Sequence, residues 1–124
     1  MTCILVVEDE GEVREMLVEF LRDEGFEIIE ATTADAAVPL LDSENLQLIV
    51  TDINLPGRLD GIKLACAARQ AHPGIPVIFI SGRPTMLEDA HALENPAAFL
   101  QKPFSFDTLL GNVRRLAGVV HEIA

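Results

Sequence analysis

Acidic residues, a serine and a lysine follow four separate apolar runs of the sequence. Glu8 and Asp9 follow the first run, and Asp52, Ser81 and Lys102 stand at the ends of three later runs. Clustered carboxylates repel one another unless a proton or a cation neutralises them, and Mg²⁺ takes one or two carboxylates together with phosphate oxygens. A carboxylate kept ionised beside such a cation can attack phosphorus, while an ammonium group and a hydroxyl stabilise the transferring oxygens. These residue types predict metal-assisted phosphoryl transfer to a carboxylate, provided that the fold brings them together.

The segments that must position these residues alternate between strand and helix patterns. Short apolar runs bounded by Gly, Pro or polar residues predict five strands, at residues 3–7, 26–29, 46–50, 76–80 and 97–101. Apolar residues at helical spacing predict helices from Val13 to Leu21, after residue 33, at about residues 61–71, at about residues 85–93, and from Phe106 to Val120. Strands that alternate with helices indicate a parallel sheet covered on both faces.

This order predicts an α/β fold, a (βα)₅ doubly wound parallel sheet of five strands in the order 2-1-3-4-5, with helices on both faces. Right-handed crossovers leave few other topologies. The length of 124 residues fits one domain, so residues 1–124 are expected to form a single unit. Ligands of such folds bind at the carboxyl ends of the strands, where the acidic residues, Ser81 and Lys102 stand.

Three local features carry further expectations. Thr32 or Thr33 caps the second helix, with Asp35 placed to complete a capping box for Thr32, and Pro39 should kink or shorten that helix. The two cysteines, Cys3 and Cys66, lie in apolar stretches without metal-like spacing, so both are expected to be buried free thiols.

The charge balance limits the classes of partner. The net charge is −11, and so acidic a surface repels the phosphates of nucleic acids, which argues against direct DNA or RNA binding. No apolar run approaches the roughly 20 residues that span a bilayer, and the N-terminus lacks the basic region of a signal peptide. The expectation is a cytoplasmic protein without a membrane segment.

Several motifs together resemble the receiver domains of response regulators in two-component signalling. The resemblance covers essentially the whole chain and rests on Ile4-Leu5-Val6-Val7-Glu8-Asp9, Thr51-Asp52-Ile53-Asn54-Leu55-Pro56, Asp60-Gly61, Ile80-Ser81-Gly82 and Phe99-Leu100-Gln101-Lys102-Pro103-Phe104.

The resemblance implies a role for each matching residue of the site. Asp52 would be the phosphoacceptor, on a site that also binds Mg²⁺ or Mn²⁺. Asp9 would be a direct metal ligand and Glu8 a ligand through water, with the backbone carbonyl of Asn54 completing the protein ligands. Lys102 would pair with a phosphoryl oxygen, and the bond from it to Pro103 would be cis, as such bonds cost least before proline.

The resemblance also implies a switch and its partners. Ser81 would bind the phosphoryl group after activation, and Phe99 would follow as the aromatic switch residue. The phosphoryl donor would be a histidine kinase or a histidine phosphotransfer protein. The receiver would assist its own phosphorylation and dephosphorylation without being an enzyme. The face formed by residues 85–93, 97–101 and the last helix would then change its affinity for a downstream protein or for a second copy, giving a weak or phosphorylation-dependent homodimer.

Two departures from the family pattern and three alternatives remain. The loop before Asp60-Gly61 is one residue longer than the commonest form, and Gly82 replaces the usual alanine after Ser81. The main alternative is a phosphorylation-independent interaction module on the same fold. A second alternative is a phosphatase with an Asp nucleophile, but such an enzyme needs a second carboxylate at the position of Asn54. A flavin or nucleotide binder would want a Gly-rich loop after the first strand, which the sequence lacks.

Overall fold

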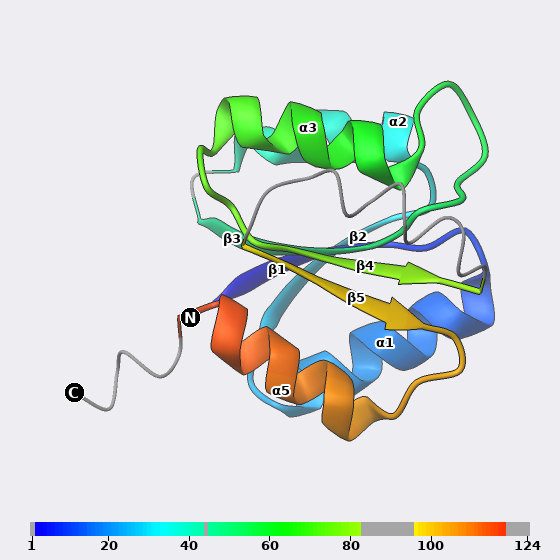
Figure 1. Ribbon diagram of the computed structural model, residues 1–124, viewed down its shortest axis with the longest axis vertical. Coiled ribbons are helices and arrows are strands. Elements are labelled where there is room, and N and C mark those ends of the chain that lie inside the picture. Colours follow the sequence, from blue (N-terminus) through cyan, green and yellow to red (C-terminus); the bar gives the residue numbers. More distant parts are fainter. Residues whose placement is uncertain (1, 44, 83–95, 119–124) are drawn as a thin grey trace.

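The computed structural model describes residues 2–43, 45–82 and 96–118, and it contains one parallel sheet of five strands (Figure 1). The strands lie in the order β2-β1-β3-β4-β5, as predicted. Their bounds are Cys3–Val7 for β1, Glu27–Ala31 for β2, Leu46–Asp52 for β3, Val77–Ser81 for β4 and Ala97–Gln101 for β5. The helix expected at about residues 85–93 lies outside the described residues, as does Val120.

Helices cover both faces of the sheet. Figure 1 shows α2 and α3 on one face, and α1 and α5 on the other. The helices comprise Gly11–Asp23 (α1), Ala34–Ala37 (α2), Gly61–Ala71 (α3) and Phe106–Leu116 (α5), with a 3-10 helix, η1, at Val38–Asp42. No helix among the described ranges is long and apolar enough to cross a membrane.

Two apolar cores lie on either side of the sheet because strand side chains alternate between its faces. Leu5 and Val7 of β1 pack into the core beneath α2 and α3. Ile4 and Val6 pack into the core beneath α1 and α5. All five residues of β1 are buried, which explains why its sequence is continuously apolar rather than alternating. The two cores pack against the strands on both sides, and the site lies at the carboxyl ends of these strands.

The second helix is shortened as predicted, and one of the two predicted threonines caps it, but the predicted capping box is wrong. Proline cannot donate to the helical ladder, and α2 passes into the 3-10 helix η1 around Pro39. Thr33 is the N-cap and accepts a hydrogen bond from the amide of Ala36. The capping box between Thr32 and Asp35 does not form. Asp35 Oδ2 instead accepts from the amide of Arg58, 3.1 Å away in the loop after β3.

The prediction that both cysteines are buried is half right. Cys3 is buried in β1, and burial raises the pKa of its thiol. Cys66 is exposed on α3, whose buried face is formed by Gly61, Leu64, Ala65 and Ala68. The apolar neighbours of Cys66 suggested burial, whereas helical spacing places it off the buried face.

Candidate functional site

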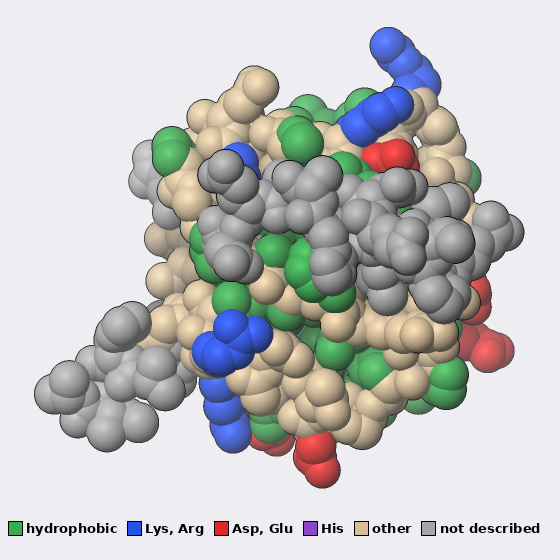
Figure 2. All heavy atoms as spheres, viewed as in Figure 1, with side chains coloured by type: hydrophobic (Ala, Val, Ile, Leu, Met, Phe, Trp, Pro, Cys, Tyr) green, Lys and Arg blue, Asp and Glu red, His purple; other side chains and the backbone are tan. Residues whose placement is uncertain are grey.

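The parallel register brings the ends of β1, β3, β4 and β5 to one edge of the sheet. Val7 pairs with Thr51, Asp52 with Ile80, and Ser81 with Gln101. The residues that follow these pairs therefore stand side by side, although up to 94 positions separate them in sequence. Figure 2 shows acidic side chains at the edge of the molecule toward which the strands of Figure 1 point.

Three carboxylates converge at this edge. Glu8, Asp9 and Asp52 each place a carboxylate oxygen within 4.8 Å of the others. Glu8 and Asp52 are buried, whereas Asp9 is exposed. Asp9 and Asp52 border a hollow of about 240 Å³, which is also lined by Glu10, Asn54, Ser81, Gly82 and Lys102. Glu8 does not line the hollow, but its carboxylate contacts Lys102, which does.

Lys102 bridges two of the carboxylates. Its Nζ donates to Glu8 Oε1 at 2.8 Å and to Asp52 Oδ2 at 3.0 Å. Burial lowers the pKa of the Lys102 ammonium, but the hydrogen bonds to Glu8 and Asp52 outweigh burial and hold that pKa above its ordinary value. Lys102 is therefore a fixed positive charge. The peptide bond from Lys102 to Pro103 is cis, as the resemblance implied.

Backbone amides hold the two buried carboxylates from the other side. Asp52 Oδ1 accepts from the amide of Asn54 at 3.1 Å, and Glu8 Oε2 accepts from the amide of Glu10 at 3.3 Å. Burial raises the pKa of the Glu8 carboxyl, and the charge of Asp52 raises it further against the lowering effect of Lys102. Each carboxylate thus has one oxygen bound to Lys102 and the other bound to the chain next to it.

The site fits a hard divalent cation. Its donors are carboxylate oxygens at close range, which suit Mg²⁺ or Mn²⁺ better than softer metals. The backbone around Asn54 lies in the same hollow. In the absence of a cation, Lys102 is the positive group that the described residues bring between Glu8 and Asp52.

Glu8 should make the stability of the metal-free protein depend on pH. Its pKa is higher in the folded chain than in the unfolded chain, so the folded state holds the proton more tightly. The free energy of unfolding should therefore fall as pH rises through the interval between the two pKa values. Urea denaturation in EDTA, followed by circular dichroism from mildly acidic to neutral pH, measures this fall. In Glu8→Gln the part due to Glu8 should disappear, and an identical pH profile of the two proteins would refute the assignment.

Ser81 and Phe99, the predicted switch residues, lie at and near the end of the sheet. Ser81 is the buried last residue of β4, and its carbonyl accepts from the amide of Lys102 at 2.8 Å. Phe99 is half-buried in β5 and stacks on Phe79, with ring centroids 5.7 Å apart. Ser81 therefore borders the same hollow as Asp52 and Lys102, while Phe99 lies two strand positions farther from the end of the sheet, level with Phe79.

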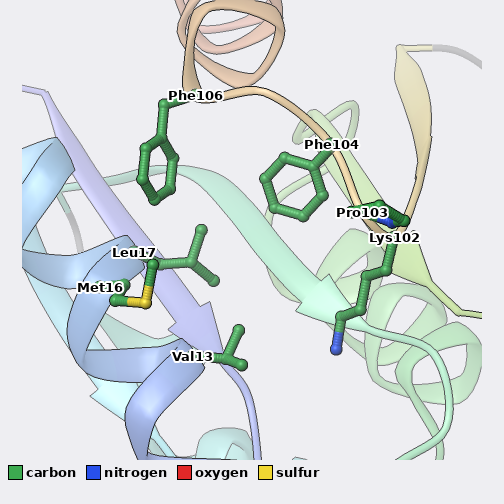
Figure 3. Close-up of a pocket in the computed structure, with 7 residues that line it drawn as sticks. All are labelled: Val13, Met16, Leu17, Lys102, Pro103, Phe104 and Phe106. Carbon is green, nitrogen blue, oxygen red and sulfur yellow. The ribbon is translucent and has the colours of Figure 1, made fainter.

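An apolar groove of about 380 Å³ adjoins the site. Figure 3 shows side chains of α1 facing those of the segment between β5 and α5 across it. The lining residues are Val13, Met16, Leu17, Lys102, Pro103, Phe104 and Phe106. Met16 is 55% exposed, which is unusual for so large an apolar side chain. Because Lys102 borders both the groove and the hollow, a protein seated in the groove would stand beside Asp52.

Two positioning contacts near the site are not evident from the sequence. Arg14 of α1 donates from Nη1 to the carbonyl oxygen of Glu8 at 3.0 Å. Asp35 fixes the loop after β3 through the amide of Arg58. One contact uses the backbone carbonyl of Glu8 and the other uses the backbone amide of Arg58. Because every residue has such backbone groups, the types of residue in the sequence do not indicate these contacts.

The family model and the similar known proteins indicate the same protein family. The sequence model of the response regulator receiver domain matches residues 4–114. Nitrogen assimilation regulatory protein NtrX of Azorhizobium caulinodans is 36% identical over 109 residues, covering 86% of this chain and 24% of NtrX. Transcriptional regulatory protein YxdJ of Bacillus subtilis is 32% identical over 115 residues, covering 92% of this chain and 49% of YxdJ. The chain thus spans between a quarter and a half of the length of these relatives.

Similar solved structures indicate the same family as the sequence comparisons. Response regulator protein TrrA of Thermotoga maritima, crystallised in complex with Mg²⁺ and BeF, superposes with a TM-score of 0.83 at 32% identity, covering 94% of this chain and 99% of TrrA. A response regulator receiver protein from Sinorhizobium medicae gives a TM-score of 0.87 at 30% identity, covering 94% of each chain. The sequence motifs, the strand order and these matches agree, and the chain belongs to the response regulator receiver domain family.

Proposed function

We propose that this receiver domain is a signalling switch, which is activated when Asp52 accepts a phosphoryl group in the presence of Mg²⁺. Receiver domains act as signalling switches rather than as conventional enzymes, and those of response regulators interact with histidine kinases and downstream effectors. The observation that carries the proposal for this chain is the contact of Lys102 with both Glu8 and Asp52, beside a third carboxylate. Glu8, Asp9, Asp52 and the carbonyl of Asn54 are the proposed cation ligands.

The chain's own residues prepare Asp52 for transfer from a phosphohistidine. The amide of Asn54 holds Oδ1 of Asp52, which leaves the carboxylate in a fixed orientation at the wall of the hollow. A carboxylate oxygen attacks phosphorus, the phosphorus–nitrogen bond breaks, and the imidazole of the donor keeps the electron pair. A bound Mg²⁺ supplies charge neutralisation for the acidic cluster and the phosphoryl oxygens. Lys102 stabilises the charge of the transferring group from the other side.

The response to phosphorylation is assigned to Ser81 and Phe99. The Ser81 hydroxyl moves toward the new phosphoryl oxygens, and the ring of Phe99 moves into the space that this movement leaves. Phe99 has no hydroxyl, so its position depends on packing, which here includes the stack on Phe79. The consequence is a changed surface around β5 and α5, which alters affinity for a downstream protein or a second copy. A local charge thereby biases an element with two states.

We infer that the phosphodonor docks against the groove between α1 and the β5–α5 segment. The groove is apolar, exposes Met16, and shares Lys102 with the phosphoacceptor site. A helical kinase or phosphotransfer domain seated there brings its histidine close to Asp52.

Met16→Asp should slow phosphoryl transfer from a phosphorylated histidine kinase by roughly tenfold or more, because it places a charge in an apolar contact of the docked complex. The rate with acetyl phosphate should stay the same, since a small donor needs no docking surface. Val38→Asp is the matched control, because Val38 is the other large apolar side chain exposed in the described ranges and lies on η1. Equal slowing of both donors, or equal slowing by both variants, would remove the groove from the docking surface.

We further propose that residues 1–124 form one receiver domain that works in the cytoplasm. The net charge of −11 supports protein partners rather than direct contact with nucleic acid. Phosphorylation-independent binding on the same fold remains the alternative, and loss of Asp52 would leave such binding unchanged.

A further inference from the structure

Arg14 connects the ends of two strands beside the acidic cluster. Its Nη1 donates to the carbonyl oxygen of Glu8 at 3.0 Å, and its Nε donates to Glu30 Oε1 at 3.2 Å. The Arg14 side chain is 17% exposed, and the Glu30 side chain that it contacts is 40% exposed. Glu30 belongs to β2, and Glu8 follows β1. The arginine therefore connects the turn after β1 to the neighbouring edge strand β2.

The carbonyl that Arg14 binds lies between the two acidic residues of this turn. It belongs to the peptide unit that joins Glu8 to Asp9, and a peptide unit is planar. A bond to this oxygen consequently restrains the orientation of the peptide that joins the Cα atoms of Glu8 and Asp9, which carry two of the three carboxylates. The turn is also held by the amide of Glu8, which donates to the carbonyl of Ala31 at 3.2 Å, and by the amide of Glu10, which donates to the Glu8 side chain at 3.3 Å. Lys102 Nζ binds the Glu8 side chain at 2.8 Å, and the amide of Arg14 donates to the Glu10 carbonyl at 2.9 Å. Among these contacts, only the bond from the Arg14 side chain reaches the carbonyl oxygen of the Glu8–Asp9 peptide.

We propose that Arg14, anchored by Glu30, is a positioning residue that orients the Glu8–Asp9 peptide for binding of a divalent cation. This inference rests on the proposed function, which makes Glu8 and Asp9 cation ligands. Groups that orient metal ligands by hydrogen bonds commonly contribute about 10- to 100-fold to metal affinity. Arg14 would act in this way through the backbone, without touching the cation.

The direction of the effect separates this role from simple electrostatics. A positive charge close to the cluster repels a cation, so its removal would strengthen cation binding if charge were all that mattered. The positioning role predicts the opposite, because the loss of the hydrogen bond frees the turn and weakens cation binding. Arg14→Lys sharpens the distinction, since it keeps the charge but loses the fork that reaches Glu8 and Glu30 together.

Arg22 provides a matched control on the same helix. It also approaches Glu30, with Nη2 3.9 Å from Oε2, and it donates to the carbonyl of Ile28 at 3.4 Å. Neither contact reaches the turn after β1. Arg22→Met therefore removes the same charge and a contact to the same glutamate, but leaves the Glu8–Asp9 peptide bound to Arg14.

The test is a Mn²⁺ titration of the full chain, followed by electron paramagnetic resonance, with circular dichroism showing that each variant is folded. Arg14→Met should raise the dissociation constant about 10-fold or more. Arg14→Lys should raise it severalfold, and Arg22→Met should stay within about 2-fold of the wild type. Arg14→Lys decides the matter by itself if Arg14→Met does not fold.

Asp9→Asn separates failure of this inference from failure of the proposed site. If Asp9→Asn weakens Mn²⁺ binding while both Arg14 variants bind as the wild type does, or more tightly, the positioning role is wrong and the cation site stands. If Asp9→Asn leaves Mn²⁺ binding unchanged, the cation site itself is wrong, and the role of Arg14 is overturned with it.

Discussion

Lys102→Met should lower the free energy of unfolding of the metal-free protein by about 3 kcal/mol, because it leaves two acidic groups without their cationic partner. Lys102 Nζ contacts Glu8 at 2.8 Å and Asp52 at 3.0 Å, and the Glu8 side chain is only 1% exposed. A carboxylate at such a position cannot regain full hydration when its partner is lost. The lysine side chain is itself 23% exposed, which places the expected loss at the low end for buried pairs.

Urea denaturation followed by circular dichroism measures this loss, since the chain has no Trp or Tyr for fluorescence. Saturating Mg²⁺ should restore part of the stability, because the cation neutralises the same carboxylates. Phosphorylation by acetyl phosphate should still slow by roughly 100-fold, as expected for loss of a charge-stabilising donor. Lys63→Met is the control, because Lys63 is the only other lysine and lies exposed on α3. Equal destabilisation by the two variants would show that Lys102 is not the partner of the cluster.

Gly61→Ala should destabilise the protein by about 3 kcal/mol and displace Asp52, because the added methyl group has no room. A Cβ at Gly61 would overlap the carbonyl oxygen of Asp52 and would lie 2.9 Å from the Cα of Ile53. Both are backbone atoms, so no rotation of a side chain relieves the contact. The amide of Gly61 also donates to the carbonyl of Ile53 at 2.8 Å, which holds the two segments together.

Gly111→Ala is the matched control for this substitution. Gly111 lies within α5, and nothing lies within 4 Å of a Cβ built there. Alanine is the better helix former, so this variant should gain up to about 1 kcal/mol. Denaturation midpoints and Mn²⁺ affinities of the two variants check the contrast. A Gly61→Ala protein with wild-type stability and wild-type cation affinity would show that the close approach of α3 to β3 does not determine the position of Asp52.

The sequence predicted much of the fold because its strands are short apolar runs with clear ends. Residues 97–101 and 61–71 form β5 and α3 with the predicted bounds. The alternation of strands and helices predicts the strand order, and this order places Glu8, Asp52 and Lys102 at one edge of the sheet. The start and end of β2 were less well predicted, because Phe26 is buried and apolar yet precedes the strand.

What the sequence could not predict depends on contacts to backbone atoms. From the sequence alone, Arg14 is expected to be an ordinary charge on the surface of a helix. Nothing in the residue types indicates that it binds the Glu8 carbonyl. Asp35 was assigned to a local capping box, but a tertiary contact with Arg58 competes for it. The family pattern marked Gly61 as part of an Asp-Gly pair, whereas the reason for glycine became evident only from its packing against β3.

Intact-mass spectrometry of the full chain, after incubation with acetyl phosphate and Mg²⁺, tests most directly whether Asp52 is the phosphoacceptor. Asp52→Asn and a parallel sample in EDTA serve as controls. We predict one added phosphoryl group on the wild-type chain and none in either control. An adduct that persists in Asp52→Asn would contradict the assignment of Asp52 as phosphoacceptor. A folded wild-type chain that stays unmodified both with acetyl phosphate and with a phosphorylated histidine kinase would favour a phosphorylation-independent binding module.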